Sequence, residues 1–377
     1  MISQVWISPT QLSGPVALGS SGVITDTFGI TRFMSLAPNM TGWFAQQPAA
    51  SFQSRVDAGS DTYAVLRFDH ASFTAPRFPV LKCYGSASPT PRWTFQFQNP
   101  VQSTASGLHV SRDGQTIVAW VFDYTQLRTV IHTFGPNSGT PTRTTNVNTV
   151  GLPSMSAMSD DGSTILLVSN IMRITVNVRN GTVIEQTNGA NIGLACALTP
   201  IGNVQLIGRI RRYVDVFPGT PIDSGNDSAY AAAIRTDGST VTIAWSNSLV
   251  QVIDLATRAI VWSSPIAGTA TDMEVSPDGQ VIAVGGTWLT VFENRVKTFE
   301  QDLPGTVNDV DVTNTHVACG SRVDASTGRV DLFARAASQP GPTEYRCVIP
   351  APAVQGATHP AIAFPTGSGA NIQVRVL

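Results

Sequence analysis

Apolar and polar residues repeat along the chain as a short apolar run, a polar turn and a second apolar run. The turn has the form Ser-x-Asp-Gly, or Arg-Thr-Asp-Gly in one copy, and the run after it is rich in Val, Ile and Ala. The plainest copies are Gly107–Trp120, Ser156–Ser169, Ala232–Trp245 and Asp272–Gly286. Because Gly adopts positive φ angles freely and Asp can hydrogen-bond its own backbone, each copy predicts a β-hairpin.

Weaker copies with other turn residues fill the gaps between these hairpins. They are Ser54–Phe68, Leu194–Gly208, Asp309–Ser321 and Ala361–Leu377. The eight turns lie near residues 59, 114, 162, 202, 238, 279, 314 and 367, at intervals of about 35 to 55 residues. Those intervals bracket the length of one β-propeller blade, roughly 40 to 50 residues.

A third β-type run follows most hairpins, and a fourth often follows the third. Third runs are Arg128–Phe134, Met172–Val178, Leu249–Leu255 and Leu289–Asn294, and Ala259–Ser264 is a fourth. Four strands per repeat is the composition of a propeller blade. The pattern therefore predicts an all-β fold, a single β-propeller over residues 1–377 with eight four-stranded blades, or seven if a weak copy is miscounted.

The hairpin near residue 367 leaves its blade two strands short. We expect residues 1–46 and 350–377 to form this closing blade together. Gln4–Ser8 and Gly22–Phe28 are candidate strands from the beginning of the chain, and His359–Phe364 and Asn371–Leu377 are candidates from its end. Such pairing of N- and C-terminal strands would remove an exposed sheet edge.

These hairpins, together with phrases such as Val252–Trp262, give the chain a resemblance to the WD40-like and quinoprotein-like β-propellers. The resemblance covers the chain from about Ser51 and concerns the fold, because no Trp-Asp ends a third strand and no Gly-His opens a blade. It implies that the loops between second and third strands share one face with the blade-to-blade connections, at the mouth of a central channel. The Asp-Gly hairpins would lie on the opposite face.

The candidate binding residues lie on those second-to-third-strand loops. They are Tyr124, Arg209, Arg211, Arg212, Asn247, Trp288 and Arg322. The three clustered arginines suit a carboxylate or a phosphate, although simple solvation of alternate strand positions would also explain them. The two aromatic residues are either anchors for a partner or packing groups between blades.

Composition excludes several classes of protein. Hydrophobic residues make up 42% and charged residues 13%, with a formal net charge of −2, which argues against disorder and against nucleic-acid binding. No apolar run is long enough for a membrane span, and the first residues lack a secretory signal pattern. We therefore expect a cytoplasmic protein with four single thiols, while sequons at Asn39, Asn180 and Asn226 leave secretion as an alternative.

No standard catalytic motif is present, neither G-x-S-x-G, H-E-x-x-H, a P-loop nor G-x-G-x-x-G. The five histidines are scattered, and His109 and His132 fall inside predicted strands, where we expect structural roles. The sequence therefore indicates no metal and no cofactor.

Three classes of function remain. We favour a non-catalytic scaffold that binds a protein partner at the channel-mouth face, and the low charge also permits self-association. The alternatives are a small-molecule or carbohydrate-binding propeller, and a propeller enzyme, a hydrolase or an oxidoreductase, with its site in the central channel. Convergence of acids, histidines or a metal in the channel would favour an enzyme.

Overall fold

The computed structural model describes residues 2–10, 15–27, 30–36, 42–46, 51–69, 78–98, 106–148, 151–169, 171–188, 193–209, 213–223, 225, 227–235, 237–323 and 328–335. These residues form strands and turns. No helix in this part of the chain could span a membrane.

Eight antiparallel four-stranded sheets, the blades, make up the fold. Blade 1 holds β2 (Val16–Leu18), β3 (Gly22–Thr27), β4 (Ile30–Ser35) and β5 (Gly42–Gln46). Blade 2 holds β6 (Ser51–Gly59), β7 (Thr62–Asp69), β8 (Phe78–Tyr84) and β9 (Trp93–Gln96). Blade 3 holds β10 (Ser106–Val110), β11 (Ile117–Asp123), β12 (Arg128–Phe134) and β13 (Arg143–Asn148). Blade 4 holds β14 (Met155–Met158), β15 (Thr164–Val168), β16 (Met172–Asn177) and β17 (Val183–Asn188).

The second half of the ring repeats this order. Blade 5 holds β18 (Gly193–Leu198), β19 (Gln205–Arg209), β20 (Tyr213–Phe217) and β21 (Ile222–Asp223). Blade 6 holds β22 (Ala229–Ile234), β23 (Thr240–Trp245), β24 (Leu249–Asp254) and β25 (Ile260–Pro265). Blade 7 holds β26 (Ala270–Val275), β27 (Val281–Gly286), β28 (Trp288–Glu293) and β29 (Val296–Asp302). Blade 8 holds β30 (Thr306–Val312), β31 (His316–Arg322), β32 (Gly328–Arg335) and β1 (Ile2–Thr10).

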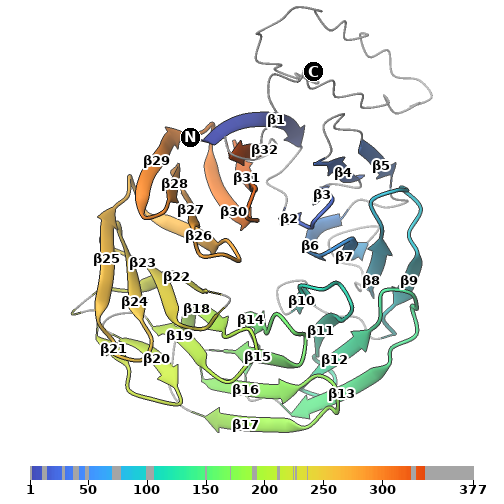
Figure 1. Cartoon of the computed structure of the whole chain (residues 1–377). Coiled ribbons are helices and arrows are strands. Elements are labelled where there is room, and N and C mark those ends of the chain that lie inside the picture. The colour runs from blue at the N-terminus through green and yellow to red at the C-terminus, as the bar shows by residue number, and fades with distance from the viewer. Residues whose placement is uncertain are drawn as a thin grey trace, which may run out of the picture.

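The blades stand around one axis, and the first strand of each repeat lines the centre (Figure 1). Each first strand contacts the first strand of the next blade, including β30 against β2, so the ring is closed. The prediction of an eight-bladed propeller is confirmed. We call the side with the second-to-third-strand loops and the blade-to-blade connections the loop face, and the opposite side the hairpin face.

The Ser-x-Asp-Gly turns owe their form to a repeated set of hydrogen bonds. Ser111 Oγ donates to Asp113 Oδ1 at 2.6 Å, and the same carboxylate oxygen accepts the Gln115 N–H at 2.9 Å. The turns at Ser159 and Ser276 repeat both bonds. Gly114 has a φ of +71°, in the left-handed region that glycine adopts without strain. The predicted hairpins therefore form through the expected turn chemistry, a glycine at positive φ and an aspartate that hydrogen-bonds within its own turn.

The closing blade differs from the expected one. Residues 2–10 form β1 and pair with β32 in blade 8, whereas residues 16–46 form the separate blade 1. Assigning residues 1–46 to a single blade missed the β2–β3 hairpin, because its turn between Leu18 and Gly22 carries no Asp-Gly pair. Residues 350–377, with the hairpin expected near residue 367, lie outside the described residues.

Apolar side chains fill the spaces between neighbouring blades. One buried cluster joins blades 2 and 3 and includes Leu66, Leu81, Ile117 and Phe134. Another joins blade 8 to blade 1 through Val16, Met34, Val330 and Leu332. The core is therefore distributed around the ring, and its centre is left to polar side chains on the first strands.

Candidate functional site

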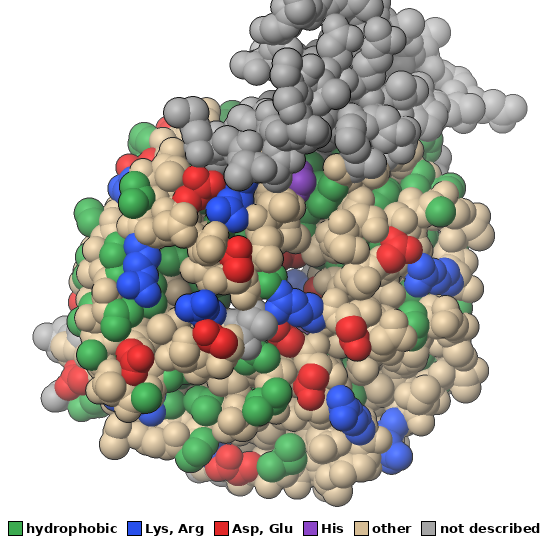
Figure 2. All heavy atoms as spheres, in the orientation of Figure 1, with side chains coloured by type: hydrophobic (Ala, Val, Ile, Leu, Met, Phe, Trp, Pro, Cys, Tyr) green, Lys and Arg blue, Asp and Glu red, His purple; other side chains and the backbone are tan. Residues whose placement is uncertain are grey.

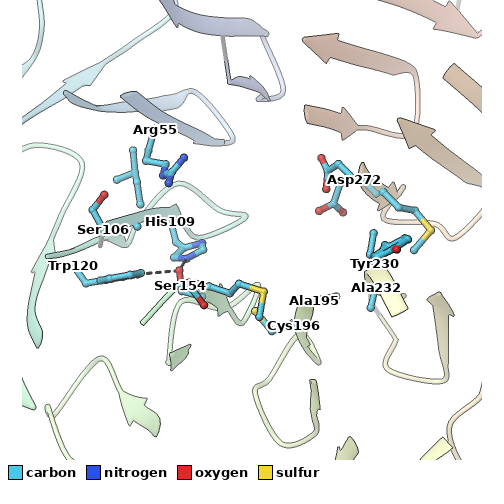
Figure 3. Close-up of a pocket in the computed structure, with 17 residues that line it drawn as sticks. Arg55, Ser106, His109, Trp120, Ser154, Ala195, Cys196, Tyr230, Ala232 and Asp272 are labelled. Carbon is cyan, nitrogen blue, oxygen red and sulfur yellow. Dashed lines mark hydrogen bonds between the residues drawn. The ribbon is translucent and has the colours of Figure 1, made fainter. Parts of the chain in front are cut away.

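Charged residues gather on the first strands, where they line a cavity of about 430 Å³ in the centre of the ring. Its walls include Arg55 on β6, His109 on β10, Ser156 on β14, and Asp272 and Glu274 on β26. Arg55 and His109 lie on one wall and Asp272 on the opposite wall, with Cys196 and Tyr230 between them (Figure 3). We call this space the central channel.

The register of the hairpins explains why these side chains meet. Four of the first strands carry a titratable residue two positions before the turn that follows the strand. These residues are Asp57, His109, Glu274 and Asp311, and each of their strands pairs antiparallel with the second strand of its blade. Three of the first strands also carry a charged residue four positions before the turn, namely Arg55, Asp272 and Asp309. Alternate residues of a strand point to the same side, so each strand presents these positions at matching heights along the axis.

Several of the channel carboxylates bind the backbone of the next blade. Asp57 Oδ2 accepts the Val110 N–H at 2.8 Å, and Asp272 Oδ2 accepts the Val310 N–H at 2.8 Å. These N–H groups belong to the inner edges of first strands, which have no further strand to pair with. The carboxylates thus satisfy edge donors and fasten neighbouring blades together.

Two such bonds join the last blade to the first. Asp309 Oδ2 accepts the Val16 N–H and Asp311 Oδ2 accepts the Leu18 N–H, both at 2.6 Å. Together with the β1–β32 ladder, they connect the two ends of the described chain.

The channel raises the pKa of its carboxyl groups. Burial among protein atoms raises the pKa of Asp57 and of Asp311 to about 7, and raises that of Glu274 well above its usual value. Asp57 and Asp311 are half-buried and Glu274 is exposed, but the protein atoms around each carboxyl replace bulk solvent, and that desolvation is the main cause. Near neutral pH the channel therefore holds fewer negative charges than its composition suggests.

Asp272 and Asp309 lie on the neighbouring first strands β26 and β30. Burial raises the pKa of both, and their carboxyl groups hydrogen-bond to each other. A bond between two carboxyl groups requires one proton on the pair. Among the described residues, no three His, Cys, Asp or Glu side chains are arranged to hold a metal ion.

His109 links three blades across the channel wall. Its Nε2 lies 2.7 Å from Ser156 Oγ in blade 4, and its Nδ1 lies 3.9 Å from Asp57 Oδ2 in blade 2. Burial lowers the pKa of the imidazole to about 4, so the ring is neutral at pH 7. Trp120 Nε1 also donates to Ser156 Oγ, at 2.9 Å.

The candidates that the structure describes with their side chains lie in second-to-third-strand loops or at the strand ends beside them, on four different blades: Tyr124, Asn247, Trp288 and Arg322. Asn247 is exposed and donates from Nδ2 to Asp227 Oδ2 at 2.8 Å. Arg322 is exposed at the end of β31, and Arg209 ends β19. The side chain of Arg209 and all of Arg211 and Arg212 lie outside the described part of the chain.

The two aromatic candidates are half-buried. The Tyr124 ring packs edge-on against Phe122 with centroids 4.9 Å apart, and its buried hydroxyl has no hydrogen-bond partner among the described residues. Trp288 begins β28 and pairs with Asp302.

Sequence reasoning missed the channel residues because it searched loops. A signal was present, since charged residues occupy alternate positions just before the turn in Arg55-Val56-Asp57, Asp272-Met273-Glu274 and Asp309-Val310-Asp311. A charged side chain at such a position of a buried first strand destabilises the fold unless it is paired or faces water.

The loop face also exposes apolar side chains on three consecutive blades. Phe78 in blade 2, Leu127 in blade 3, Leu152 in the connection to blade 4 and Ile171 in blade 4 are 40%, 65%, 40% and 41% exposed. Ile171 lies against Gly151, next to Leu152. We call these four residues the apolar arc.

A groove of about 410 Å³ adjoins Phe78 and is lined by Val80, Gln96, Phe97 and Gln98. In the view of Figure 2, acidic and basic side chains alternate without a continuous patch of either sign, and the surface is hollowed at the centre of the ring. No protein-family model matches this chain, and no curated protein shows significant sequence similarity to it.

Proposed function

We propose that this protein is an interaction scaffold that binds a protein partner through its loop face, with the apolar arc as the contact surface. The observation that carries the proposal is the exposure of four large apolar side chains on one face of three neighbouring blades. Large apolar side chains that are exposed together on one face are typical of interaction sites. The groove beside Phe78 offers a pocket for an anchoring side chain.

The fold supports this use of the surface. The arc residues Leu127 and Ile171 directly precede β12 and β16, whose backbones are held by pairing within their blades. Preorganised loops lose little conformational entropy on binding. The mixed charges around the arc favour a partner with an apolar centre and a neutral polar rim over a nucleic acid.

Kinship with the WD40-like or quinoprotein-like propellers, a cytoplasmic location and self-association remain parts of this proposal. Cys83, Cys196 and Cys319 are free thiols, as in a protein of a reducing compartment. The self-association that low surface charge permits would use the same arc.

The test replaces two arc residues by aspartate, in Leu127→Asp/Ile171→Asp, and compares the proteins retained by this variant and by the unchanged chain from a lysate of its own cells. Ile201→Asp is the matched control, because Ile201 is 64% exposed on the hairpin face. A partner lost at least tenfold in the double variant but kept by the control supports the proposal, as one buried charge costs several kcal/mol. A set of retained proteins that is the same for all three chains overturns it.

Sedimentation velocity on the same three chains separates a foreign partner from a second copy. Concentration-dependent association that the double variant loses assigns the arc to self-association. If the unchanged chain is monomeric at all concentrations, the arc is assigned to contact with a different protein.

A further inference from the structure

Three polar side chains on three successive first strands lie in a row along the channel wall. Ser156 Oγ lies 2.7 Å from His109 Nε2, and His109 Nδ1 faces Asp57 Oδ2 at 3.9 Å. Hydroxyl, imidazole and carboxylate in this order are the groups of a serine nucleophile with its general base and the acid that orients it.

The surrounding hydrogen bonds favour the arrangement of protons that such a site needs. The indole N–H of Trp120 can only donate, so Ser156 Oγ accepts it and keeps its own proton for another acceptor. His109 Nε2 is the acceptor within reach. The remaining ring proton then sits on Nδ1, facing Asp57. Burial keeps the imidazole neutral at pH 7, which is the form that can accept a proton.

Gly107 is a second, independent sign that this contact is built into the fold. A Cβ at residue 107 would lie 2.2 Å from Trp120 Nε1 and 2.7 Å from Ser156 Oγ. Only glycine leaves room for the indole and the hydroxyl to meet there, although glycine weakens the interior of a strand.

The serine is accessible to a ligand. Ser156 and His109 both line the central channel, and so does the Arg55 guanidinium, on the same wall as His109 (Figure 3). A guanidinium that lines the same cavity as a nucleophile can hold a carboxylate of the substrate. The channel volume of about 430 Å³ suits a small molecule.

We propose that Ser156, His109 and Asp57 form an acyl-transfer site that hydrolyses small carboxylic esters in the central channel. This activity is additional to partner binding and uses a different part of the molecule. Ser156 Oγ attacks the ester carbonyl while His109 Nε2 takes the hydroxyl proton, and the ester C–O bond breaks as that proton passes to the leaving alcohol. Water then attacks the acyl-serine, His109 takes its proton and returns one to Ser156 Oγ, and the carboxylic acid leaves. Asp57 is a positioning residue that stabilises the imidazolium.

The test treats the folded full-length protein with a fluorophosphonate and maps the modified peptide by mass spectrometry. The expected result is a phosphonyl adduct on Ser156. In His109→Gln, which keeps a polar side chain but removes the base, the labelling rate should fall about 100-fold or more. Ser154→Ala is the matched control, because Ser154 also lines the channel, and its labelling should be unchanged.

Two further measurements keep folding and chemistry apart. Thermal unfolding is measured for every variant, and labelling rates are compared only among variants that unfold cooperatively. Asp57→Asn should slow the labelling at pH 8, where the Asp57 carboxyl of the unchanged chain is ionised, because loss of that negative charge disfavours the imidazolium that forms during the reaction. At pH 5, where the Asp57 carboxyl is already protonated, the two chains should differ much less, whereas a merely structural carboxylate would leave the labelling rate unchanged at both pH values. A folded protein without an adduct on Ser156, or an adduct that forms equally fast in His109→Gln, overturns the proposal. The Leu127→Asp/Ile171→Asp variant should label normally, so failure of one proposal leaves the other standing.

Discussion

The carboxylate of Asp309 accepts a hydrogen bond from the backbone N–H of Val16 at 2.6 Å and joins two strands 293 residues apart in the chain. Asp311 and Leu18 repeat the contact with the same length and separation. The ring is therefore fastened at its centre by two carboxylates as well as at its rim by β1.

Removing both carboxylates should loosen the junction between blades 8 and 1. In Asp309→Ala/Asp311→Ala, two backbone donors lose their acceptors, at a cost of about 1–3 kcal/mol each. Thermal melting should show a clear loss of stability in this variant. The Asn/Asn variant keeps an acceptor oxygen at each position and should melt close to the unchanged chain. Equal melting of the Ala and Asn variants would show that the two bonds do not hold the ring.

The raised carboxyl pKa values predict an unusual dependence of stability on pH. Asp57 and Asp311 titrate near pH 7 in the folded chain and near 3.8 when unfolded, so the folded state binds more protons between these values. Stability from these groups is present below about pH 4 and is lost as the pH rises through 7. One pKa unit corresponds to about 1.4 kcal/mol, and water in the channel reduces the effect.

The measurement compares melting temperatures from pH 5 to pH 8 for the unchanged chain and for Asp57→Asn/Asp311→Asn. The variant should gain relative to the unchanged chain as the pH rises, by about 1–3 °C for each 1–2 kcal/mol at this chain length. Parallel curves would contradict the assignment of these two carboxyls as the titrating groups.

Substitution at Gly107 should disturb the contact between Trp120 and Ser156. The added methyl group of Gly107→Ala would overlap the indole nitrogen, and such overpacking costs about 1–3 kcal/mol or more. Gly135→Ala is the control, since a Cβ there meets no atom within 4 Å. Chemical denaturation should show a loss for the first variant and no loss, or a small gain, for the second.

A buried ion pair between blades 1 and 2 should be sensitive to removal of one partner. Arg67 Nη1 and Asp26 Oδ1 are 2.6 Å apart and both side chains are fully buried. Arg67→Met leaves the Asp26 carboxylate without that cation, at a cost of about 3–5 kcal/mol. The double variant Asp26→Leu/Arg67→Met should recover part of the loss in a denaturant titration, and a double variant no more stable than Arg67→Met would show that the pair itself contributes little.

The repeated turns explain how much of the fold the sequence predicts. The expected third run Arg128–Phe134 matches β12, and Leu249–Leu255 differs from β24 by one residue, because each follows a hairpin whose turn chemistry is strong. Blade 1 escaped notice since the Gly-Ser-Ser-Gly turn at residues 19–22 gives no Asp-Gly signal.

The candidate site was harder to predict for a different reason. Loop residues can be found from strand order alone, and Asn247 and Arg322 do lie on the loop face. The contact of His109 with Ser156 spans 47 residues and joins two blades. It depends on how the blades are aligned along the axis, which no local pattern encodes.

The place of β1 in blade 8 has a consequence for the timing of synthesis. Residues 2–10 leave the ribosome before the rest of the ring, but β32, with which they pair, ends at residue 335. At about 5–20 residues per second, the interval is roughly 15–65 s. During that time blades 1 to 7 can form in order while β1 has no partner strand. Blade 8 is therefore completed after the other seven blades, although one of its strands is synthesised before all of them.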